Sequence, residues 1–290
     1  MSVSIGITER GDACQDLSWT KLIDYVDGAI IISKGFNSDF NNELLKYKNK
    51  IIYHATCTGL GGTILEPNVP FYLDQIENIK LLINSGFPVE HIVVRIDPII
   101  PKDIFVQLPD YARNIDEKFK ENSLEKDYKY VAIVTDIIYR CLDLGIRRFR
   151  YSFLDLYSHV IKRLENKNIL ISRNEINESE CSDWMMQFDS IEDNIYFKDN
   201  NIKKNKDEVY NINPQDLTVF FESCAEKYTR DHHKIGCVSK RDFEILGLNI
   251  EDVNGSSNQR PLCLCCSAKT ELLKSKKPCP HSCLYCYWKN

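Results

Sequence analysis

The sequence lacks the features of membrane, secreted and extended nucleic-acid-binding chains. No apolar run approaches the ~20 residues that a transmembrane helix needs. Residues 1–5 carry neither a positive cluster nor a long apolar core, so no secretory signal is predicted. The 37 Lys and Arg against 42 Asp and Glu give a net charge of −5, not the basic excess that an extended nucleic-acid groove usually leaves. We therefore expect a cytoplasmic protein that does not associate with membranes.

The 12 cysteines are the most informative part of the composition. Because the cytosol keeps thiols reduced, so many cysteines indicate a role other than disulfide formation. Four are scattered over the first 200 residues, whereas eight fall between Cys224 and Cys286, six of them in the last 28 positions. This clustering predicts metal sites toward the C-terminal end of the chain.

Strand-like and helix-like segments alternate along the first 160 residues. Apolar or β-branched runs predict strands over 3–8, 29–33, 50–56, 91–97 and 148–153, and a later one over 217–221. Helical apolar spacing predicts helices over 16–26, 40–47, 128–144 and 158–165, and one that begins near Pro70. This alternation is typical of βαβ units and predicts an α/β fold with a parallel sheet.

Polar segments follow several of the predicted strands. They are 8–12, Lys34, 56–66, 95–97 and 155–157. Ligands of α/β barrels and open parallel sheets bind at the carboxyl ends of the strands, so these segments predict an active-site rim. Each polar residue taken alone is more simply explained as a helix cap or a turn.

The terminal segment reads Cys279-Pro-His-Ser-Cys283-Leu-Tyr-Cys286-Tyr-Trp, with the spacing Cys-x3-Cys-x2-Cys. Three thiolates on one loop can hold three irons of a [4Fe–4S] cluster and leave the fourth open, whereas electron-transfer clusters generally use four cysteines. The motif resembles that of radical S-adenosylmethionine (SAM) enzymes, which bind SAM at the open iron. In those enzymes the reduced cluster cleaves SAM to a 5′-deoxyadenosyl radical, and the protein orients and shields this chemistry.

Zinc is the alternative ligand for these cysteines. Cys263-x2-Cys266 and Cys283-x2-Cys286 are separated by 16 residues, which satisfies a zinc-ribbon pattern. That interpretation leaves Cys279 unused although Cys279 completes the triplet, so the sequence favours the cluster. The alternative functions are a non-catalytic zinc-binding protein and an iron–sulfur protein for electron transfer or redox sensing.

The other C-terminal cysteines predict a second metal site. Four thiolates suffice for an auxiliary [4Fe–4S] cluster or a structural zinc ion, and the sequence leaves both open. The expected ligands are Cys224, Cys237, Cys263 and Cys265, with Cys266 as an alternative to Cys265. His232 and His233 read as ordinary surface or core residues and are left out of this site.

Motifs along nearly the whole chain add to the family resemblance. They are Arg10-Gly-Asp12, Ser33-Lys34, Thr56-x-Thr58-Gly59, Glu66-Pro-Asn-Val-Pro70, Arg95-Ile-Asp97-Pro98 and Ser152-Phe-Leu-Asp155-Leu-Tyr157. With the cysteine loop, they resemble a large uncharacterised bacterial family of radical-SAM-like proteins and, more distantly, spore photoproduct lyase and the DNA repair photolyases. In the lyase the cysteine loop comes first, whereas here it comes last. The resemblance therefore implies a circularly permuted partial (β/α) barrel of radical SAM type, with a strand over 267–273 as its first strand.

We expect one integrated domain with three parts. Residues 1–171 hold the βα units of the barrel, and residues 172–213, rich in Asn, Asp, Glu and Lys, form a polar insertion. Residues 214–290 contain the last barrel strands, the second metal site and the cluster-binding loop.

The resemblance implies roles for residues on the rim. Lys34 corresponds to the lysine that pairs with the SAM carboxylate in spore photoproduct lyase. Asp12 or Glu9 would accept from the SAM amino group, and Tyr287 would pack the cluster or relay a radical. The expected cofactor-binding residues are Lys34, Glu9, Asp12, Thr56, Thr58, Arg95, Asp97 and Tyr285.

One position departs from spore photoproduct lyase. The lyase has a hydrogen-donor cysteine where this chain has Glu9, so the lyase activity itself is not predicted. Cys14 and Cys57 stand near the predicted rim without matching that position, and with Tyr287 they are the candidate catalytic residues.

The substrate class is open between a nucleic acid or nucleotide, a peptide and a small molecule. Two basic groups favour a nucleic acid, although a solvated face explains them equally well. They are Arg147, Arg148 and Arg150, and Lys274, Lys276 and Lys277. The expected protein partner is a reductant such as flavodoxin or ferredoxin.

Overall fold

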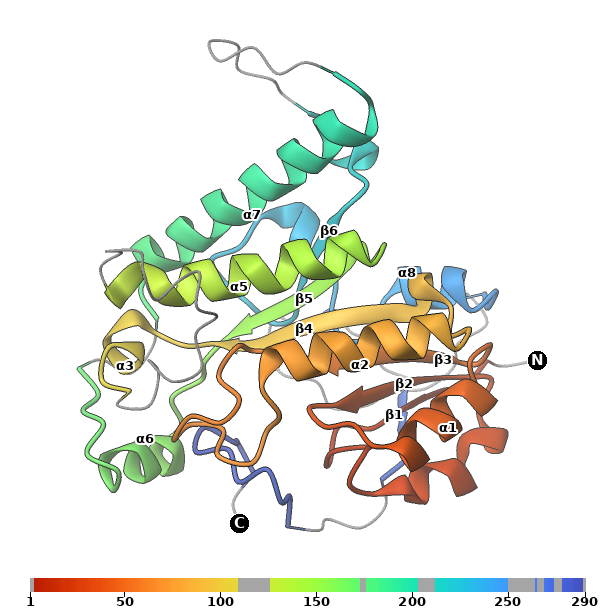
Figure 1. The fold of residues 1–290 in the computed structure, drawn as a ribbon, viewed down its shortest axis with the longest axis horizontal. Coiled ribbons are helices and arrows are strands. Elements are labelled where there is room, and N and C mark those ends of the chain that lie inside the picture. Colours follow the sequence, from red (N-terminus) through yellow and green to blue (C-terminus); the bar gives the residue numbers. More distant parts are fainter. Residues whose placement is uncertain are drawn as a thin grey trace.

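A seven-stranded parallel sheet lies at the centre of the protein (Figure 1). The computed structural model describes residues 3–108, 126–172, 176–202, 212–249, 264, 269–273 and 278–288. The strands are β1 (Ile5–Ile7), β2 (Gly28–Ser33), β3 (Ile51–Thr56), β4 (Ile92–Ile99), β5 (Arg148–Phe153), β6 (Phe220–Ser223) and β7 (Lys269–Glu271). Their pairings are all parallel, which confirms the α/β fold class.

The sheet places the last strand of the chain beside the first. Its order is β6-β5-β4-β3-β2-β1-β7, so sheet neighbours are also sequence neighbours except at the β1–β7 pair. There Ile5 pairs with Lys269 and Ile7 pairs with Glu271. The strand predicted over 267–273 is thus confirmed over Lys269–Glu271. A sheet that runs from β7 through β1 to β6 is compatible with a partial barrel.

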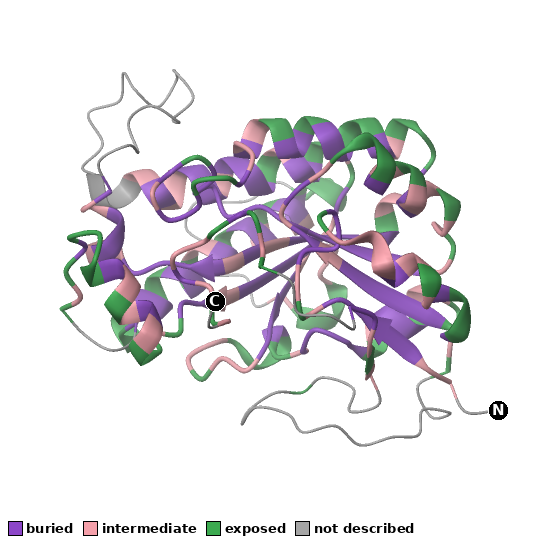
Figure 2. Ribbon diagram, turned by 90° about the horizontal axis from the view of Figure 1, so that it is seen from below, coloured by how far each residue is buried: buried purple, intermediate pink, exposed green. Residues whose placement is uncertain are grey.

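Two hydrophobic cores cover the two faces of the sheet. Alternate strand residues point to opposite faces, so Ile31 of β2 lies in the larger core and Ile30 lies in the smaller one. The larger core includes residues of α1 (Ser38–Lys46), α2 (Tyr72–Asn84), α3 (Lys102–Phe105), α5 (Lys126–Asp143), α6 (Ser158–Glu165) and α7 (Glu178–Asp199). The smaller core includes Phe243 of α8 (Lys240–Ile245). Figure 2 shows that buried residues dominate the strands.

Side-chain caps set the first residue of several helices. Asn37 accepts a hydrogen bond from the Phe40 amide at 2.8 Å at the start of α1. Ser239 and Asp242 form a capping box at the start of α8. These hydrogen bonds satisfy free backbone amides in the first turns of α1 and α8 and so fix where the two helices begin.

The segment predicted as a helix over 16–26 is instead two short 3-10 turns. They are η1 (Leu17–Lys21) and η2 (Ile23–Tyr25). The fully buried Trp19 donates from its indole nitrogen to the Ala13 carbonyl at 3.1 Å. This bond ties the segment back to the loop after β1, which favours the tighter turns over a regular helix.

Helix α7 lies within the stretch that the sequence predicts as a polar insertion. It has 22 residues, and it is capped by Asn177, which accepts from the Glu180 amide at 2.7 Å. Trp184, Phe188 and Ile191 are buried in the larger core. The polar composition of residues 172–213 hid this apolar face, so the sequence did not predict the helix, and the polar insertion itself stays a prediction.

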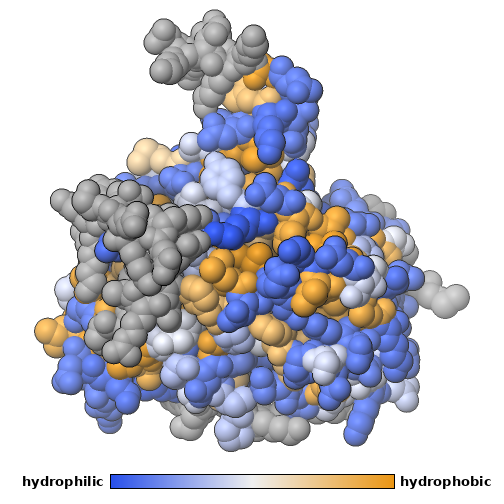
Figure 3. All heavy atoms as spheres, in the orientation of Figure 1, coloured by the Kyte–Doolittle hydropathy of each residue, from blue (hydrophilic) through white to orange (hydrophobic). Residues whose placement is uncertain are grey.

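Hydrophilic and hydrophobic side chains are interspersed on the face of the molecule drawn in Figure 3. Within the described part of the chain, no helix has the combined length and apolar character of a membrane span.

Candidate functional site

The cysteine loop, residues 278–288, lies across the carboxyl ends of the first three strands. His281 Nε2 lies 3.1 Å from Oδ2 of Asp12, which follows β1. Asn68, in the connection after β3, donates to the Pro280 carbonyl at 2.7 Å. The Leu284 amide donates to the carbonyl of Leu65 at 3.0 Å. The loop therefore occupies the rim that the sequence predicts as the active site.

Helix α6, which follows β5, holds the other end of the loop. The Arg163 guanidinium donates to the carbonyls of Cys286 and Trp288, both at 2.6 Å. His159 Nε2 lies 2.8 Å from the carbonyl of Tyr287. In Figure 1 the dark blue C-terminal segment lies beside α6 accordingly. Backbone carbonyls of the loop are thus fixed by side chains from a segment more than a hundred residues earlier in the sequence.

Glu66 is the centre of a buried polar cluster beneath the loop. Lys34, which follows β2, donates to Glu66 Oε1 at 2.7 Å, and the Tyr285 hydroxyl donates to the same oxygen. Thr58 donates to Glu66 Oε2 at 2.7 Å. The Lys34 ammonium also reaches the Tyr285 hydroxyl at 2.8 Å and the Asp97 carbonyl at 3.3 Å. Three of the predicted cofactor-binding side chains, Lys34, Thr58 and Tyr285, therefore meet at a residue to which the sequence assigns no role.

The Lys34 ammonium keeps its charge in this environment. Burial acts to lower the pKa of Lys34, but the Glu66 carboxylate and Cys283 raise it, and the net shift is upward. A permanent positive charge thus lies close to one of the three loop thiols.

The three loop thiols lie near one another and are half-buried. Burial raises the pKa of Cys283 to about 12, although the charge of Lys34 acts to lower it. Cys279 and Cys286 both act on the pKa of Cys283, which places the three sulfurs in one electrostatic environment. Burial also raises the pKa of Cys279. Cys279 and Cys283 therefore favour the protonated form, and a metal bound by them must displace these protons.

Asp12 organises the loop after β1. It accepts from Ser33 Oγ and the Lys34 amide, both at 2.7 Å, and from the Cys14 amide at 3.0 Å. Burial acts to raise the pKa of Asp12, but the hydrogen bond and charge of His281 lower it, so Asp12 is ionised. Both carboxylate oxygens of Asp12 thus already contact donor groups of the protein itself.

Glu9 and Tyr287 meet at the edge formed by β7. The Glu9 carboxylate accepts from Lys269 Nζ at 2.6 Å, and the Glu9 amide donates to Glu271 at 3.1 Å. The Tyr287 hydroxyl donates to the Glu9 carbonyl at 3.1 Å, and 51% of Tyr287 is exposed. Burial of its hydroxyl end raises the pKa of Tyr287, so the phenol stays protonated.

A row of polar residues crosses the sheet near the same rim. Thr56, Arg95, Arg150 and Glu222 are successive partners in the strand register from β3 to β6. Arg95 pairs with Asp97, and Asp97 also accepts from Ser152. The predicted residues Thr56, Arg95 and Asp97 therefore lie on β3 and β4, and Lys34 links the Asp97 carbonyl to Tyr285 of the cysteine loop.

Two arginines that suggested a nucleic-acid surface are buried in ion pairs. Arg148 Nε lies 3.0 Å from Oε1 of Glu222, and its Nη2 lies 2.7 Å from Asp242. Arg150 also pairs with Glu222, and the side chains of all four residues are at most 5% exposed. Arg148 and Arg150 are thus structural cations and do not form a basic surface.

The candidate catalytic thiols Cys14 and Cys57 lie in the larger core. Burial raises the pKa of Cys14 to about 12 and also raises the pKa of Cys57, so both are neutral thiols. Cys57 lines a small cavity of about 10 Å³ beside Lys34 and Thr56, with room for one water molecule at most.

The predicted second metal site is described only in part. Cys224 and Cys237 are buried in the smaller core next to Phe243. Cys263, Cys265 and Cys266 lie outside the described residues, so this site stays a prediction.

Sequence reasoning missed three residues that position the loop. Glu66, His281 and Arg163 each bind groups from distant segments. Glu66 stands in the Glu-Pro motif, and His281 stands between the first two loop cysteines. These two positions could have indicated from the sequence that both residues belong to the site.

A family model described as a domain of unknown function (DUF1848) matches residues 21–288. The chain belongs to the DUF1848 family. The matched range contains β2 to β7 and the whole cysteine triplet, whereas β1, Glu9 and Asp12 precede it. No curated protein matches the chain, and no solved structure matches it.

Proposed function

We propose that this DUF1848 protein is a radical SAM enzyme whose [4Fe–4S] cluster is held by Cys279, Cys283 and Cys286. The observation that carries the proposal is the position of the cysteine loop. The loop follows β7, which is the neighbour of β1, and it is bonded to segments after β1, β3 and β5. A three-cysteine loop at the carboxyl ends of parallel strands is where an α/β protein would present a reactive cofactor to a substrate.

We also propose that the sheet is a circularly permuted partial barrel. The order β7, β1, β2, β3, β4, β5, β6 is unbroken in the sheet. Cutting the chain before β7 and joining the present ends would give an ordinary succession of βα units that starts with β7 and the cysteine loop. The permutation needs no change in strand pairing, and permuted ends are tolerated at the surface of a domain.

The surroundings of the three loop thiols support an anionic cluster. The thiols are half-buried, and the positive charge of Lys34 acts on Cys283. An adjacent positive charge favours an anionic group at this place.

When bound, the reduced cluster supplies the electron that cleaves SAM and starts radical chemistry on a substrate. A flavodoxin- or ferredoxin-type reductant would deliver that electron. The residues of the chain hold the loop and its surroundings: Lys34, Glu66 and Tyr285 fix the middle of the loop, and Arg163 fixes its end. Their fixed geometry would shield the reacting groups from water.

Lys34, Thr56 and Asp97 are the proposed SAM-binding residues at this rim. Because the Lys34 ammonium already pairs with Glu66 at 2.7 Å, a SAM carboxylate would share or replace that contact. Asp12, with most of its acceptor capacity directed at protein groups, positions the His281 end of the loop.

Anaerobic reconstitution followed by iron, sulfide and zinc analysis tests the proposal. About four irons per chain are expected from the loop cluster, and about eight if the second site also holds a cluster. Cys283→Ala should lose about four irons, whereas Cys141→Ala, a cysteine buried in the larger core, should lose none. Bound zinc without any iron that can be reconstituted would contradict the proposal and indicate a structural zinc protein instead.

A further inference from the structure

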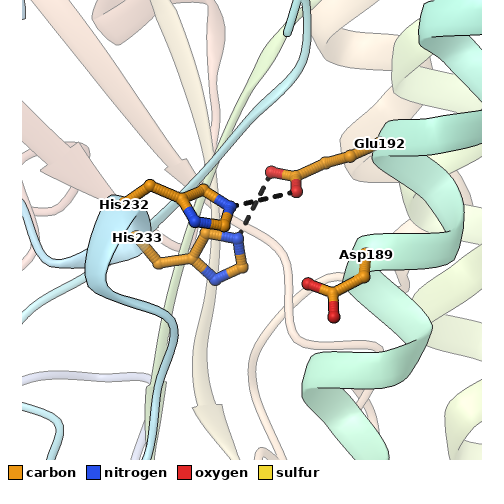
Figure 4. Close-up of side chains that lie close together, drawn as sticks. All are labelled: Asp189, Glu192, His232 and His233. Carbon is orange, nitrogen blue, oxygen red and sulfur yellow. Dashed lines mark hydrogen bonds and ion pairs between the residues drawn. The ribbon is translucent and has the colours of Figure 1, made fainter. Parts of the chain in front are cut away.

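A second group of metal-ligand side chains lies away from the cysteine loop. Asp189 and Glu192 on helix α7 face the adjacent His232 and His233 of the turn η6 (Asp231–His233), as Figure 4 shows. One ligand atom from each of the four residues lies within 4.8 Å of the others. The sequence alone gives the two histidines no metal-binding role, because their carboxylate partners stand about forty residues earlier.

We propose that His232, His233 and Glu192 bind a divalent transition-metal ion such as Zn²⁺, with Asp189 as the fourth group at the site. Imidazole nitrogens and carboxylate oxygens are ordinary ligands of such ions. The proposal concerns different residues from the cysteine loop and does not depend on the proposed radical SAM function.

The spacing of the ligand atoms supports a metal better than hydrogen bonds. His232 Nε2 and His233 Nε2 each lie 3.3 Å from a carboxylate oxygen of Glu192, the first from Oε2 and the second from Oε1. A good N–H···O bond is shorter, at about 2.9–3.0 Å. Ligands at about 2.0–2.1 Å from one tetrahedral ion are themselves about 3.3–3.4 Å apart. The observed separations therefore match neighbouring ligands on a common ion that Glu192 binds through both of its oxygens.

The ring of His233 is oriented from its other side. Its Nδ1 lies 2.9 Å from the hydroxyl of Tyr151 on β5. If Nδ1 carries the proton and donates to Tyr151, the lone pair of Nε2 points toward Glu192. Metal-binding histidines almost always use their second nitrogen in this way.

The burial of Glu192 means that a positive partner would stabilise its carboxylate. The side chain of Glu192 is 4% exposed, and that of His233 is fully buried. A carboxylate removed from water is costly unless a charge or several hydrogen bonds compensate it. A divalent ion between Glu192 and the two imidazoles supplies that compensation.

Asp189 differs from the other three residues. Its side chain is 34% exposed, and its oxygens lie 3.2 and 3.0 Å from Nε of Arg230. The ion would thus have three firm ligand residues, with Glu192 binding through both oxygens, and a further position that Asp189 or water can fill. A metal ion at this site would link α7 to the segment that carries Cys224 and Cys237.

Equilibrium dialysis of the full-length protein against buffered Zn²⁺ tests the inference. The bound zinc is compared between the wild type, His232→Ala, Glu192→Gln and the control Asp183→Asn, an exposed carboxylate on the same helix. All four proteins keep the same cysteines, so thiol-bound zinc cancels in the comparison. We expect about one zinc fewer per chain, or at least tenfold weaker binding, in the first two variants and wild-type binding in the control.

Thermal unfolding separates a lost ligand from a lost fold. Zn²⁺ should raise the Tm of the wild type and of Asp183→Asn but not of His232→Ala, whose Tm without zinc should match the metal-free wild type. Because 32% of the His232 side chain is exposed, its removal leaves little cavity. Equal zinc content and equal Tm shifts in all four proteins would overturn the proposal.

Discussion

The ammonium of Lys34 lies 2.7 Å from the carboxylate of Glu66, and both groups contact the hydroxyl of Tyr285. Lys34 follows β2, Glu66 lies between β3 and α2, and Tyr285 belongs to the cysteine loop. The side chain of Glu66 is 1% exposed, so these partners replace the water that its carboxylate has lost. A buried ion pair thus joins the rim of the sheet to the loop that would hold the cluster.

Replacing Glu66 by Gln should destabilise the protein by about 2–3 kcal/mol, because it leaves the mostly buried Lys34 charge without a carboxylate. Urea unfolding of the iron-free protein measures the change. The control is Glu77→Gln, which removes an ion pair with Lys80 in which both side chains are about half exposed, and this should change stability little. Equal effects of the two substitutions would contradict the role given to Glu66.

Arg163→Ala should loosen the end of the cysteine loop, because the guanidinium donates to the carbonyls of Cys286 and Trp288. Amide hydrogen exchange of residues 279–288 should become at least tenfold faster, and reconstituted iron should be lost more quickly under air. The neighbouring exposed residue Lys162 provides the control variant Lys162→Ala. Unchanged exchange in Arg163→Ala would show that other contacts hold the loop.

The buried Glu222 should make stability depend on acid pH. Burial acts to raise its pKa, but Arg148 and Arg150 lower it from 4.5 to about 2. Because the folded-state pKa is depressed, the stabilisation is present above pH 4.5 and is lost as the pH falls toward 2. Denaturant unfolding between pH 7 and pH 2.5 measures it.

Glu222→Gln should be less stable at pH 7 by about 3 kcal/mol, as expected for breaking a buried ion pair. Its free energy of unfolding should also fall less than that of the wild type as the pH is lowered, because the contribution of Glu222 is missing. The control variant Asp231→Asn, which removes an exposed ion pair with Lys234, should keep the contribution of Glu222. A wild-type pH profile in Glu222→Gln would contradict the assignment.

Lys34→Met should retain the loop cluster but weaken SAM binding at least tenfold, if the Lys34 charge is shared with the SAM carboxylate as proposed. Equilibrium binding of SAM to the reconstituted protein measures this. The exposed Lys21 provides the control variant Lys21→Ala. Normal SAM affinity in Lys34→Met would restrict Lys34 to its contact with Glu66 and Tyr285.

The strands could be predicted from the sequence because most of them are continuous apolar runs. Residues 29–33, 50–56 and 148–153 coincide with β2, β3 and β5 within a residue. The polar residues at the carboxyl ends of these strands could be located from the sequence as well, whereas the active site at this edge stays a proposal. Helix α7 could not, because its buried Trp184 and Phe188 stand among many acidic residues.

Contacts between distant segments account for the rest of what the sequence did not reveal. Glu66 meets Tyr285 across 219 positions, and Glu192 meets His233 across 41. No local pattern marks such pairs, because they form only when the sheet brings β3, the cysteine loop and α7 into place. Arg148 and Arg150 were misleading for the same reason, as Glu222 neutralises them from 72 positions or more away.

Formation of 5′-deoxyadenosine is the most direct test of the proposed radical SAM function. The anaerobically reconstituted wild type is incubated with SAM and dithionite, and the nucleoside is quantified against Cys283→Ala and Cys141→Ala. We expect dithionite-dependent 5′-deoxyadenosine from the wild type and Cys141→Ala, and none from Cys283→Ala. Iron-loaded wild-type protein that forms no 5′-deoxyadenosine from SAM would contradict the proposed function.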